Sequence, residues 1–357
     1  MHIMLWGRIM TPNVVFTLAW LLITLVSLVA SMAFGAANIS MQDVVQSIWG
    51  LVFELGSSDL EPLVGEVKQR IILELRAPRA VLAFLTGAGL SLAGAVLQTV
   101  TRNPLSDPYL FGISSGASFG AVLVIASITG TSLGAASAFS EFTITVGALL
   151  GSLLSVVLVV ALAGRSGSIE RMLLAGVACS FMFSAATSLV LYMSDPLAAS
   201  SLIFWTLGSF SRAEWSSLTG VIVVVGVGLL VFISFSRPLR AMLAGDESAR
   251  ALGVSVVKLR LGMLLLSSLM TAVLVANCGG IGFVGLMIPH IVRRLIQGRT
   301  INVYIATALL GGVFMVWVDV LARTLHGDFE LPVGIITAAI GSTFFLLVLY
   351  RRETHAS

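Results

Sequence analysis

Two short motifs in the chain match patterns that carry chemistry in enzymes. Gly112-Ile-Ser-Ser-Gly116 has the G-x-S-x-G spacing of a serine nucleophile elbow, and residues 280–285 have the G-x-G-x-x-G spacing of a dinucleotide-binding loop. The first needs a strand, a turn and a helix with a histidine and an acid nearby, and the second needs a preceding strand. Both stretches border long apolar runs, and all four histidines lie far from Ser114 in sequence. We interpret both matches as chance and predict no catalytic residue.

Nucleotide and metal sites are also missing from the sequence. A Walker A loop requires glycine directly before its lysine, and neither Lys68 nor Lys258 follows a glycine. A metal site requires a cluster of ligands, whereas His2, His326 and His355 are isolated. The sequence therefore predicts no cofactor, no metal and no ATP hydrolysis by this chain alone.

The composition indicates a membrane protein. The 357 residues are 57% hydrophobic and 10% charged, with a mean hydropathy of +1.04, whereas soluble domains carry about 25% charged residues. Because a helix that crosses the bilayer needs about 20 apolar residues, the chain can supply roughly ten crossings. We predict an all-α, polytopic membrane protein, and we exclude nucleic-acid binding because it needs far more charge.

Gaps in apolarity divide the chain into ten predicted spans within one transmembrane domain, 1–357. The first run has 21 residues, longer than the roughly 7–15 residues of a signal-peptide core, so we interpret it as a retained span. The predicted spans are 14–34, 80–100, 110–129, 142–163, 171–193, 215–235, 261–278, 282–297, 303–322 and 334–350.

Charge predicts the orientation of these spans. Fourteen of the 20 Lys and Arg residues fall on one side with five acidic residues, which gives net charges of +9 there and −6 on the other side. Cytoplasmic loops carry an excess of Lys and Arg, so we place the first side and both termini in the cytoplasm. The middles of the spans are almost free of the charged groups that ion-coupled carriers use. A transporter of this kind must draw its energy from another subunit.

Two loops carry helix signals. In the outer segment 35–79, Ser40 and Asp43 are typical of a helix N-terminus. In the inner segment 236–260, a first short helix ends at Gly245, Asp246 can cap a second, and Gly253 can close it. A pair of capped helices on the cytoplasmic side favours a docking surface for a cytosolic partner over a plain solvated loop. Its polar residues are Arg240, Asp246, Glu247 and Arg250.

Small residues and cysteines indicate close packing. Stripes of glycine at helical spacing let helix backbones approach in lipid; they comprise Gly112, Gly116 and Gly120 in one span, and Gly147 and Gly151 in the next. Asn103-Pro104 and Asp107-Pro108 favour turns. A disulfide needs Cα atoms within about 7 Å, and Cys179 and Cys278 lie at opposite predicted depths. We therefore expect two free, structural thiols.

One long stretch and three shorter ones resemble a known family. The segment LRAPRAVLAFLTGAGLSLAGAVLQTVTRNPLSDPYLFGISSGASFGAVL (75–123) resembles the permeases of bacterial type II ABC importers, which take up iron chelates, haem and cobalamin. The segments GDESARALGV (245–254), GGIGFVGLMIPHIVRR (279–294) and ELPVGIITAAIGSTFFLLVL (330–349) resemble the same family in the same order.

The resemblance implies an architecture and a set of partners. The chain would be a subunit of ten spans in the bacterial inner membrane, with a weak inverted repeat of spans 2–5 and 7–10. It would work as a homodimer with two cytosolic ATP-binding subunits and one periplasmic substrate-binding protein. The helices at 238–243 and 246–252 would be coupling helices, and the path would run between spans 3, 5, 8 and 10.

The resemblance also assigns a role on the outer face. Arg76, Arg79 and Arg323 match the arginines with which the family docks its binding protein. Arg76 and Arg79 stand three apart, on one helix face, and a guanidinium can grip a carboxylate at two points. The alternative is local pairing, of Arg323 with Asp319 and of Arg76 with Glu74.

The function that these observations favour is transport of an iron chelate, with a ferric siderophore ranked first and haem second. The alternatives are a cobalamin permease and, in a different class, an ATP-independent secondary carrier. An intramembrane protease would need a Ser–His pair or paired Asp residues within the spans, and the sequence offers neither in usable form.

Overall fold

The computed structural model describes residues 12–53, 64–129, 137–164, 169–194, 203, 205–296, 300–326 and 329–353. Helices and connecting turns make up this part of the chain, and it contains no strand. The prediction of an all-α protein is therefore confirmed. Both chain ends, predicted to be cytoplasmic, lie outside the described residues together with His2 and His355.

A helix lies at each of the ten predicted spans. These helices are α2 (Pro12–Ser31), α5 (Ala77–Thr101), α6 (Ile113–Thr129), α7 (Ser137–Ala163), α8 (Ile169–Met193), α10 (Trp215–Ser234), α13 (Val256–Cys278), α14 (Val284–Leu295), α15 (Thr300–Thr324) and α16 (Val333–Glu353). Among the described residues, six helices are long and apolar enough to cross a membrane, and three apolar helices are shorter. The chain is thus a multi-pass membrane protein.

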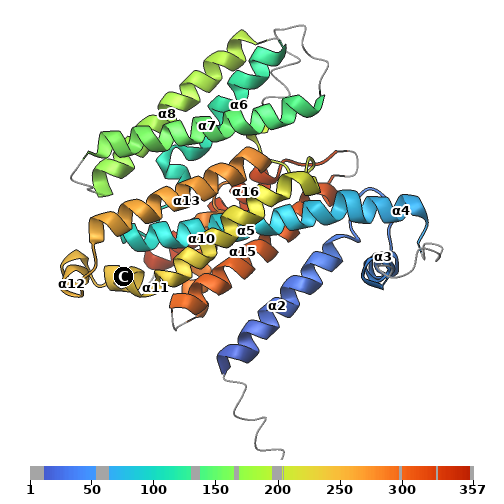
Figure 1. Cartoon of the computed structure of the whole chain (residues 1–357), viewed down its shortest axis with the longest axis horizontal. Coiled ribbons are helices and arrows are strands. Elements are labelled where there is room, and N and C mark those ends of the chain that lie inside the picture. Colours follow the sequence, from blue (N-terminus) through green and yellow to red (C-terminus); the bar gives the residue numbers. More distant parts are fainter. Residues whose placement is uncertain are drawn as a thin grey trace, which may run out of the picture.

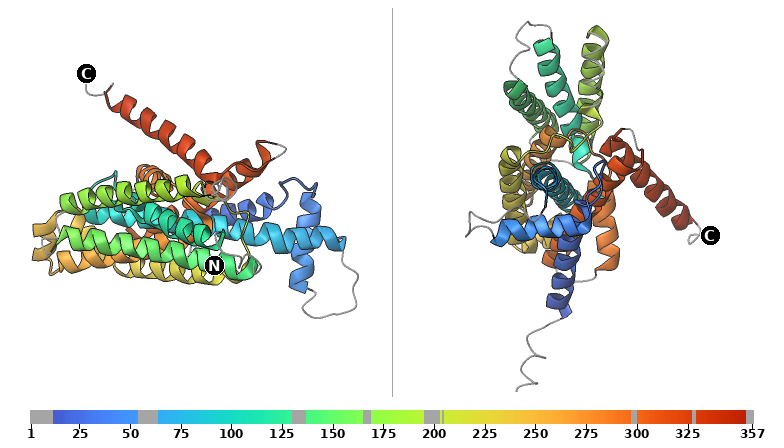
Figure 2. Two further views of the ribbon diagram at one scale, coloured as in Figure 1. Left: turned by 90° about the horizontal axis from the view of Figure 1, so that it is seen from above. Right: turned by 90° about the vertical axis from the view of Figure 1, so that its right-hand side faces the viewer.

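Six further elements lie between these helices. They are α3 (Met41–Phe53), α4 (Glu66–Arg70), the π-helix η2 (Ile71–Arg76), the 3-10 helix η3 (Pro108–Phe111), α11 (Ser236–Leu243) and α12 (Asp246–Ala251). Helices α4, η2 and α5 form one continuous helix of 36 residues, Glu66–Thr101. Helix α3 lies across the direction of the spans (Figure 2).

Helices α5 and α13 lie at the centre of the bundle and run in opposite directions (Figure 1). Helix α5 begins at the end that carries α3 and α4, and α13 begins at the end that carries α11 and α12. Helix α5 packs on α14 and α15, while α13 packs on α6 and α7. The helices α5–α8 and α13–α16 form two sets of four. The first helix of each set contacts the second and third helices of the other set, as expected for an inverted repeat.

Glycines set the separation of α6 from α7. A Cβ atom on Gly120 would lie 2.0 Å from the carbonyl oxygen of Gly147, and one on Gly151 would lie 2.1 Å from that of Gly116. The predicted stripes therefore face one another, and Gly116 opens a packing surface rather than a nucleophile elbow. Without Cβ atoms the backbones approach closely enough to gain van der Waals contact.

Helix α16 leaves the bundle at an angle (Figure 2). Its first turn is held by the N–H groups of Val333 and Gly334, which donate to the carbonyl oxygens of Gly208 and Leu207 at 3.0 Å each. Farther along, large apolar side chains of α16 are exposed, including Leu346 (69%). The described part of this chain leaves that face uncovered.

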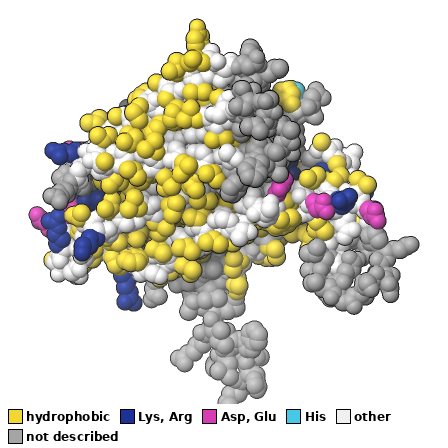
Figure 3. Space-filling view, turned by 45° about the horizontal axis from the view of Figure 1, so that its top comes forward, with side chains coloured by type: hydrophobic (Ala, Val, Ile, Leu, Met, Phe, Trp, Pro, Cys, Tyr) yellow, Lys and Arg dark blue, Asp and Glu magenta, His cyan; other side chains and the backbone are white. Residues whose placement is uncertain are grey.

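The two ends of the bundle differ in charge. Lys and Arg side chains gather at the end that carries α11 and α12, and a broad apolar surface separates this end from the other (Figure 3). This distribution agrees with the charge asymmetry of the sequence. The apolar band between the ends is the surface that a bilayer would cover.

Local helix signals in the sequence are confirmed at α3. Ser40 Oγ accepts from the N–H of Asp43 at 3.1 Å, and Asp43 Oδ2 accepts from the N–H of Ser40 at 3.0 Å. This is a reciprocal cap of the kind that begins helices. Lys68 of α4 reaches the same carboxylate at 3.0 Å. The N–H of Ser40 and then the Lys68 ammonium hold the pKa of Asp43 below its usual range.

Both cysteines are free and buried, as predicted. Cys278 Sγ donates to the carbonyl oxygen of Leu274 at 2.9 Å. The turn signals are also confirmed: Asn103 Oδ1 accepts from the N–H of Leu105 at 2.9 Å, and Asp107 Oδ1 accepts from that of Tyr109 at 2.7 Å.

The glycine contact between α6 and α7 gives a testable prediction. Gly120→Ala should destabilise the protein by about 1–3 kcal/mol, because the new methyl group overpacks a rigid backbone contact. Gly226→Ala in α10 is the matched control, since a Cβ atom there would meet nothing within 4 Å. Thermal unfolding in one detergent measures both. Equal melting temperatures for the two variants would contradict the glycine contact.

Candidate functional site

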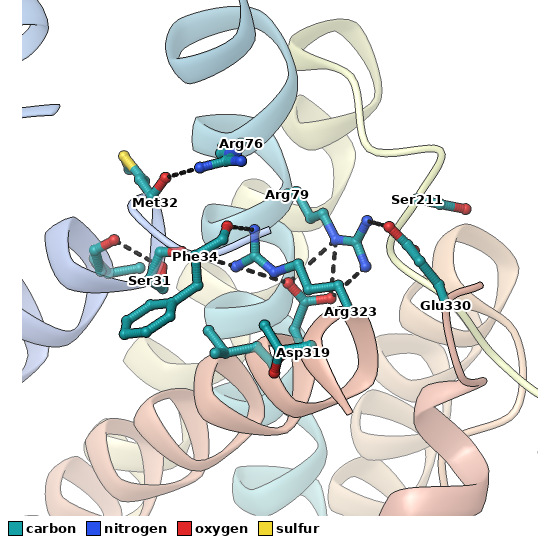
Figure 4. A network of polar contacts seen from close by, with 12 residues as sticks. Ser31, Met32, Phe34, Arg76, Arg79, Ser211, Asp319, Arg323 and Glu330 are labelled. Atoms are coloured by element: carbon teal, nitrogen blue, oxygen red, sulfur yellow. Dashed lines mark hydrogen bonds and ion pairs between the residues drawn. The ribbon is translucent and has the colours of Figure 1, made fainter. Parts of the chain in front are cut away.

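A buried ionic cluster lies at the end of the bundle opposite α11 and α12 (Figure 4). Arg79 comes from the first turn of α5, Asp319 from the last turns of α15, and Glu330 from the segment before α16. The Arg79 guanidinium donates to Asp319 Oδ1 through Nε at 2.9 Å and through Nη2 at 2.8 Å. Its Nη1 donates to Glu330 Oε1 at 2.8 Å. One guanidinium thus joins α5 to α15 and to the start of α16.

Burial makes this cluster structurally important. The Asp319 side chain is 1% exposed and that of Arg79 is 11% exposed. Arg323 lies 3.4 Å from Asp319, and its Nη2 donates to the carbonyl oxygen of Ser31 at 3.0 Å. Ser31 is the last residue of α2. The cluster therefore fixes the end of α2 as well as α5 and α15.

Arg76 also closes the end of α2. Its Nη1 donates to the carbonyl oxygen of Met32 at 2.7 Å, and its Nη2 donates to that of Ala37 at 2.7 Å. Both carbonyl groups lie in the non-helical segment that follows α2, and buried backbone oxygens of this kind need a donor. The chain turns there at Gly35, whose φ of +136° suits glycine.

The structure therefore uses all three predicted docking arginines inside the chain. The local pairing of Arg323 with Asp319 is confirmed. The predicted pairing of Arg76 with Glu74 is wrong, because Glu74 instead lies 3.6 Å from Arg70, which precedes it by four residues. The docking role stays a prediction, and it requires these guanidinium groups to exchange partners. Glu330, which is 46% exposed, is the most accessible of the present partners.

The predicted coupling residues lie at the opposite end. Arg240 in α11 and Glu247 and Arg250 in α12 are exposed. Leu252, which is 73% exposed, lies beside them. A surface hollow of about 590 Å³ adjoins this patch, and it is lined by Ser236, Arg237, Arg240, Ala241, Leu252 and Ile301.

Asp246 behaves differently from its neighbours. We expected it to cap α12, but Gly245 holds the cap position and Asp246 is the first residue of the helix. Its carboxylate accepts from Arg260 Nη2 at 2.9 and 3.0 Å, and Arg102 Nη2 lies 3.3 Å away. The prediction of its capping role is wrong because two guanidinium groups attract the carboxylate away from the helix N–H groups. The closing role of Gly253 is confirmed: its φ is +79°, and Val254 N–H donates to Ala249 O at 3.0 Å.

Residues 279–283, between α13 and α14, interrupt the helical structure. Proline lacks an N–H, so Pro289 inside α14 leaves the carbonyl of Gly285 without its helical donor. Gln98 Nε2 of α5 donates to that oxygen at 3.1 Å. The non-helical segment before α14 is stabilised by Tyr109, whose hydroxyl oxygen accepts a hydrogen bond from the N–H of Ile281. Irregular backbone inside a membrane requires such internal partners.

The described residues contain no group of three His, Cys, Asp or Glu side chains that could hold a metal ion. His290 of α14 packs its ring edge against Phe344 of α16, with the ring centroids 5.8 Å apart.

Comparisons with known proteins agree with this architecture. Residues 23–351 match the model of the FecCD transport family. The chain is 34% identical to the molybdate import system permease protein MolB of Haemophilus influenzae, over 95% of this chain and 96% of that protein. It is also 34% identical to the hemin transport system permease protein HmuU of Yersinia pestis, over 94% of this chain and 96% of that one.

A solved structure extends the likeness to three dimensions. It is an inward-facing transporter assigned to the metal-chelate ABC type, and it matches with a TM-score of 0.79 at 32% identity, over 94% of this chain and 99% of that one. The chain belongs to the FecCD family and is a permease of the type II ABC importers. The resemblance in the sequence is confirmed.

The ionic cluster predicts an unequal response to two arginine substitutions. Arg79→Met should destabilise the protein by about 3 kcal/mol or more, because it leaves Asp319 buried and short of a partner. Arg70→Met is the matched control and should cost less than about 1 kcal/mol, since Arg70 and Glu74 are 76% and 61% exposed. Arg79→Lys should fall between them because lysine cannot make the two-point contact. Thermal unfolding of the three variants checks this order, and equal losses would refute it.

Proposed function

We propose that the chain forms the translocation path of an ATP-driven importer that brings an iron chelate, a ferric siderophore first and haem second, into the cytoplasm. The observation that carries the proposal is the projecting pair of short helices, α11 and α12, at the basic end of the bundle. The sequence has no nucleotide-binding loop, so a separate subunit must hydrolyse ATP. Two charged helices that project from an apolar bundle supply the contact for such a subunit.

The proposed coupling surface consists of Arg240, Glu247 and Arg250 around the exposed side chain of Leu252. Interfaces gain specificity and association rate from charges at the rim, while the apolar side chain supplies buried area. Two ATP-binding subunits would each meet one copy of this surface.

A second copy of the chain would complete the path. Helix α8 exposes Leu174, Phe181 and Tyr192 at 72%, 73% and 89%, and α16 stands away from the bundle (Figure 2). Exposed apolar faces on two helices that border one region suit contact with a symmetric partner. In the homodimer the path would run between α6, α8, α14 and α16, which are spans 3, 5, 8 and 10.

The chemistry of these four helices supports a chelate as cargo. Helix α6 has no charged residue, and those of α8, α14 and α16 fall in their first or last turns. A path without fixed charge suits a metal that is already surrounded by organic ligands. Cobalamin is the alternative cargo, because its metal is also surrounded by organic ligands. Relatives with equal identity are named for molybdate and hemin, so selection would rest with the binding protein.

Docking of that binding protein would occur at the end that carries Arg76, Arg79 and Arg323. Arg79 is held there by Glu330, whose side chain is half exposed. A carboxylate of the binding protein can replace Glu330 on Arg79 without leaving the guanidinium unpaired. Arg76 and Arg323 would flank this contact.

Reconstituted transport tests the proposed function. Proteoliposomes that contain the chain, its ATP-hydrolysing subunits and its binding protein should accumulate radioactive ferric siderophore only when ATP is present on the side of α11 and α12. A non-hydrolysable ATP analogue should not support uptake. Uptake without the ATPase subunits would identify a secondary carrier instead. Selective uptake of cobalamin would replace the iron chelate as substrate.

Association kinetics test the docking proposal. Because rim charges act mainly on association rate, Glu330→Gln should speed binding of the loaded binding protein by roughly three- to tenfold at low salt. The matched control is Glu74→Gln, which removes an equal charge at the same end but frees only the exposed Arg70. If both substitutions speed binding equally, the cause is the lost negative charge at this end of the protein. That result would contradict the proposal that a carboxylate of the binding protein replaces Glu330 on Arg79.

A further inference from the structure

A second ionic network joins the short helix α12 to the two central helices. Asp246 is the first residue of α12, and its carboxylate accepts two hydrogen bonds from Arg260 Nη2 at 2.9 and 3.0 Å. Arg102 Nη2 lies 3.3 Å from the same carboxylate. The Asp246 side chain is 25% exposed, whereas that of Arg260 is 9% exposed. The carboxylate therefore meets one buried and one accessible cation.

Both arginines belong to ends of central helices. Arg260 lies near the start of α13, and its Nε donates to the carbonyl oxygen of Val100 in the last turn of α5 at 3.1 Å. That carbonyl is one of the last four of α5, which have no partner within the helix. Arg102 ends α5 in a left-handed conformation with φ of 51°. A single carboxylate thus reaches the C-terminal end of α5 and the N-terminal end of α13.

The other attachments of α12 are weak by comparison. The helix has six residues, and Ala249 is its one buried residue. The residues Gly245 and Gly253 flank it with φ values of +112° and +79°, which favour glycine. A helix this short gains little stability of its own. Its position relative to α5 and α13 therefore depends on the Asp246 contacts.

Movement at α12 would reach the middle of the membrane through α5. Helix α5 has 25 residues, which is roughly 37 Å at 1.5 Å per residue. Along this length it packs on α13, α14 and α15. Its other end is fixed by Arg79 to Asp319. The Asp319 carboxylate is almost fully buried, whereas the Asp246 carboxylate is 25% exposed, so the attachment of α12 is the one that can shift relative to α5 and α13.

We propose that Asp246 is a positioning residue that fastens the coupling helix α12 to α5 and α13 and so transmits the motion of an ATP-hydrolysing subunit to the path. The proposal rests on the proposed function. It gives Asp246, which we expected in the docking surface, a different role from its neighbours. Glu247 and Arg250 are exposed and would hold the ATPase, whereas Asp246 is partly buried and holds the bundle.

A merely local role would give a different result. If Asp246 only stabilised α12, its loss would disturb the surface that carries Glu247 and Arg250, and the ATPase subunit would dissociate. If Asp246 transmits motion, the ATPase subunit stays bound and hydrolyses ATP without moving substrate. The ratio of transport to hydrolysis is therefore the decisive measurement.

The experiment uses the full chain assembled with its ATPase subunits and binding protein in proteoliposomes. Asp246→Asn and Arg260→Gln should retain the ATPase subunits and basal hydrolysis within about twofold, while uptake of ferric siderophore per ATP falls at least about tenfold. Asp246→Glu, which keeps the carboxylate, should restore part of the uptake. Lys258→Gln is the matched control for Arg260→Gln, because Lys258 is an exposed cation in the same turn of α13.

Two further variants keep the proposal falsifiable. Arg102→Gln alters a side chain that is 42% exposed, so it removes one contact with Asp246 without opening the interior, and it should also lower uptake per ATP. Simultaneous Glu247→Arg and Arg250→Glu should instead release the ATPase subunits. Normal uptake per ATP in Asp246→Asn and Arg102→Gln, or loss of the ATPase subunits from them, would overturn the proposal. Failure of the unaltered complex to take up substrate with ATP would refute the proposed function instead.

Discussion

Two helix backbones can approach only as closely as their side chains allow, and around α5 glycine sets that distance. A Cβ atom on Gly87 would lie 2.0 Å from the carbonyl oxygen of Gly311 in α15, and one on Gly94 would lie 2.0 Å from that of Gly285 in α14. Lipid offers no hydrophobic drive for helix association, so such contacts supply much of the attraction. They enclose α5 so fully that 22 of its 25 residues are buried. The positions of α14, α15 and α13 all follow from this enclosure.

Enclosure of α5 also dictates where polar groups can lie. At membrane depth, the irregular start of α14 is tolerated because Gln98 of α5 bonds the carbonyl oxygen of Gly285 that Pro289 leaves without a donor. Charged groups contact α5 at its outer end, around Asp319, and within its last two turns, where Arg293 donates to the carbonyl oxygen of Ala95 and Arg260 joins Val100 to Asp246. A fully buried ion pair is costly to break, whereas a partly exposed one exchanges more easily. The attachment of α12 is thus looser than the outer cluster, while hydrogen bonds from Arg260 and Arg293 also hold the inner end of α5.

Local features of the fold could be predicted from the sequence because their partners lie within a few residues. The cap of Ser40 with Asp43, the turn at Asp107 and the helix end at Gly253 each depend on contacts two to five residues apart. Apolar run lengths similarly predicted a helix at each of the ten places where one is found, since the hydrocarbon thickness fixes how many apolar residues a crossing needs. The capping role of Asp246 failed because a stronger, distant partner, Arg260, competes for the same carboxylate.

The sequence by itself determined that this is an all-helical membrane protein with two short helices at a basic end. It also contained the charged residues of the outer cluster and the local pairing of Arg323 with Asp319, but not the partners of Arg76 and Arg79. Arg79 meets Asp319 across 240 residues and Arg76 meets Met32 across 44. Only the tertiary structure decided these pairs, because a buried charge takes whichever opposite charge or carbonyl group the packing brings within hydrogen-bond distance. That packing depends on backbone contacts between helices far apart in the chain, which spacing along one helix does not reveal.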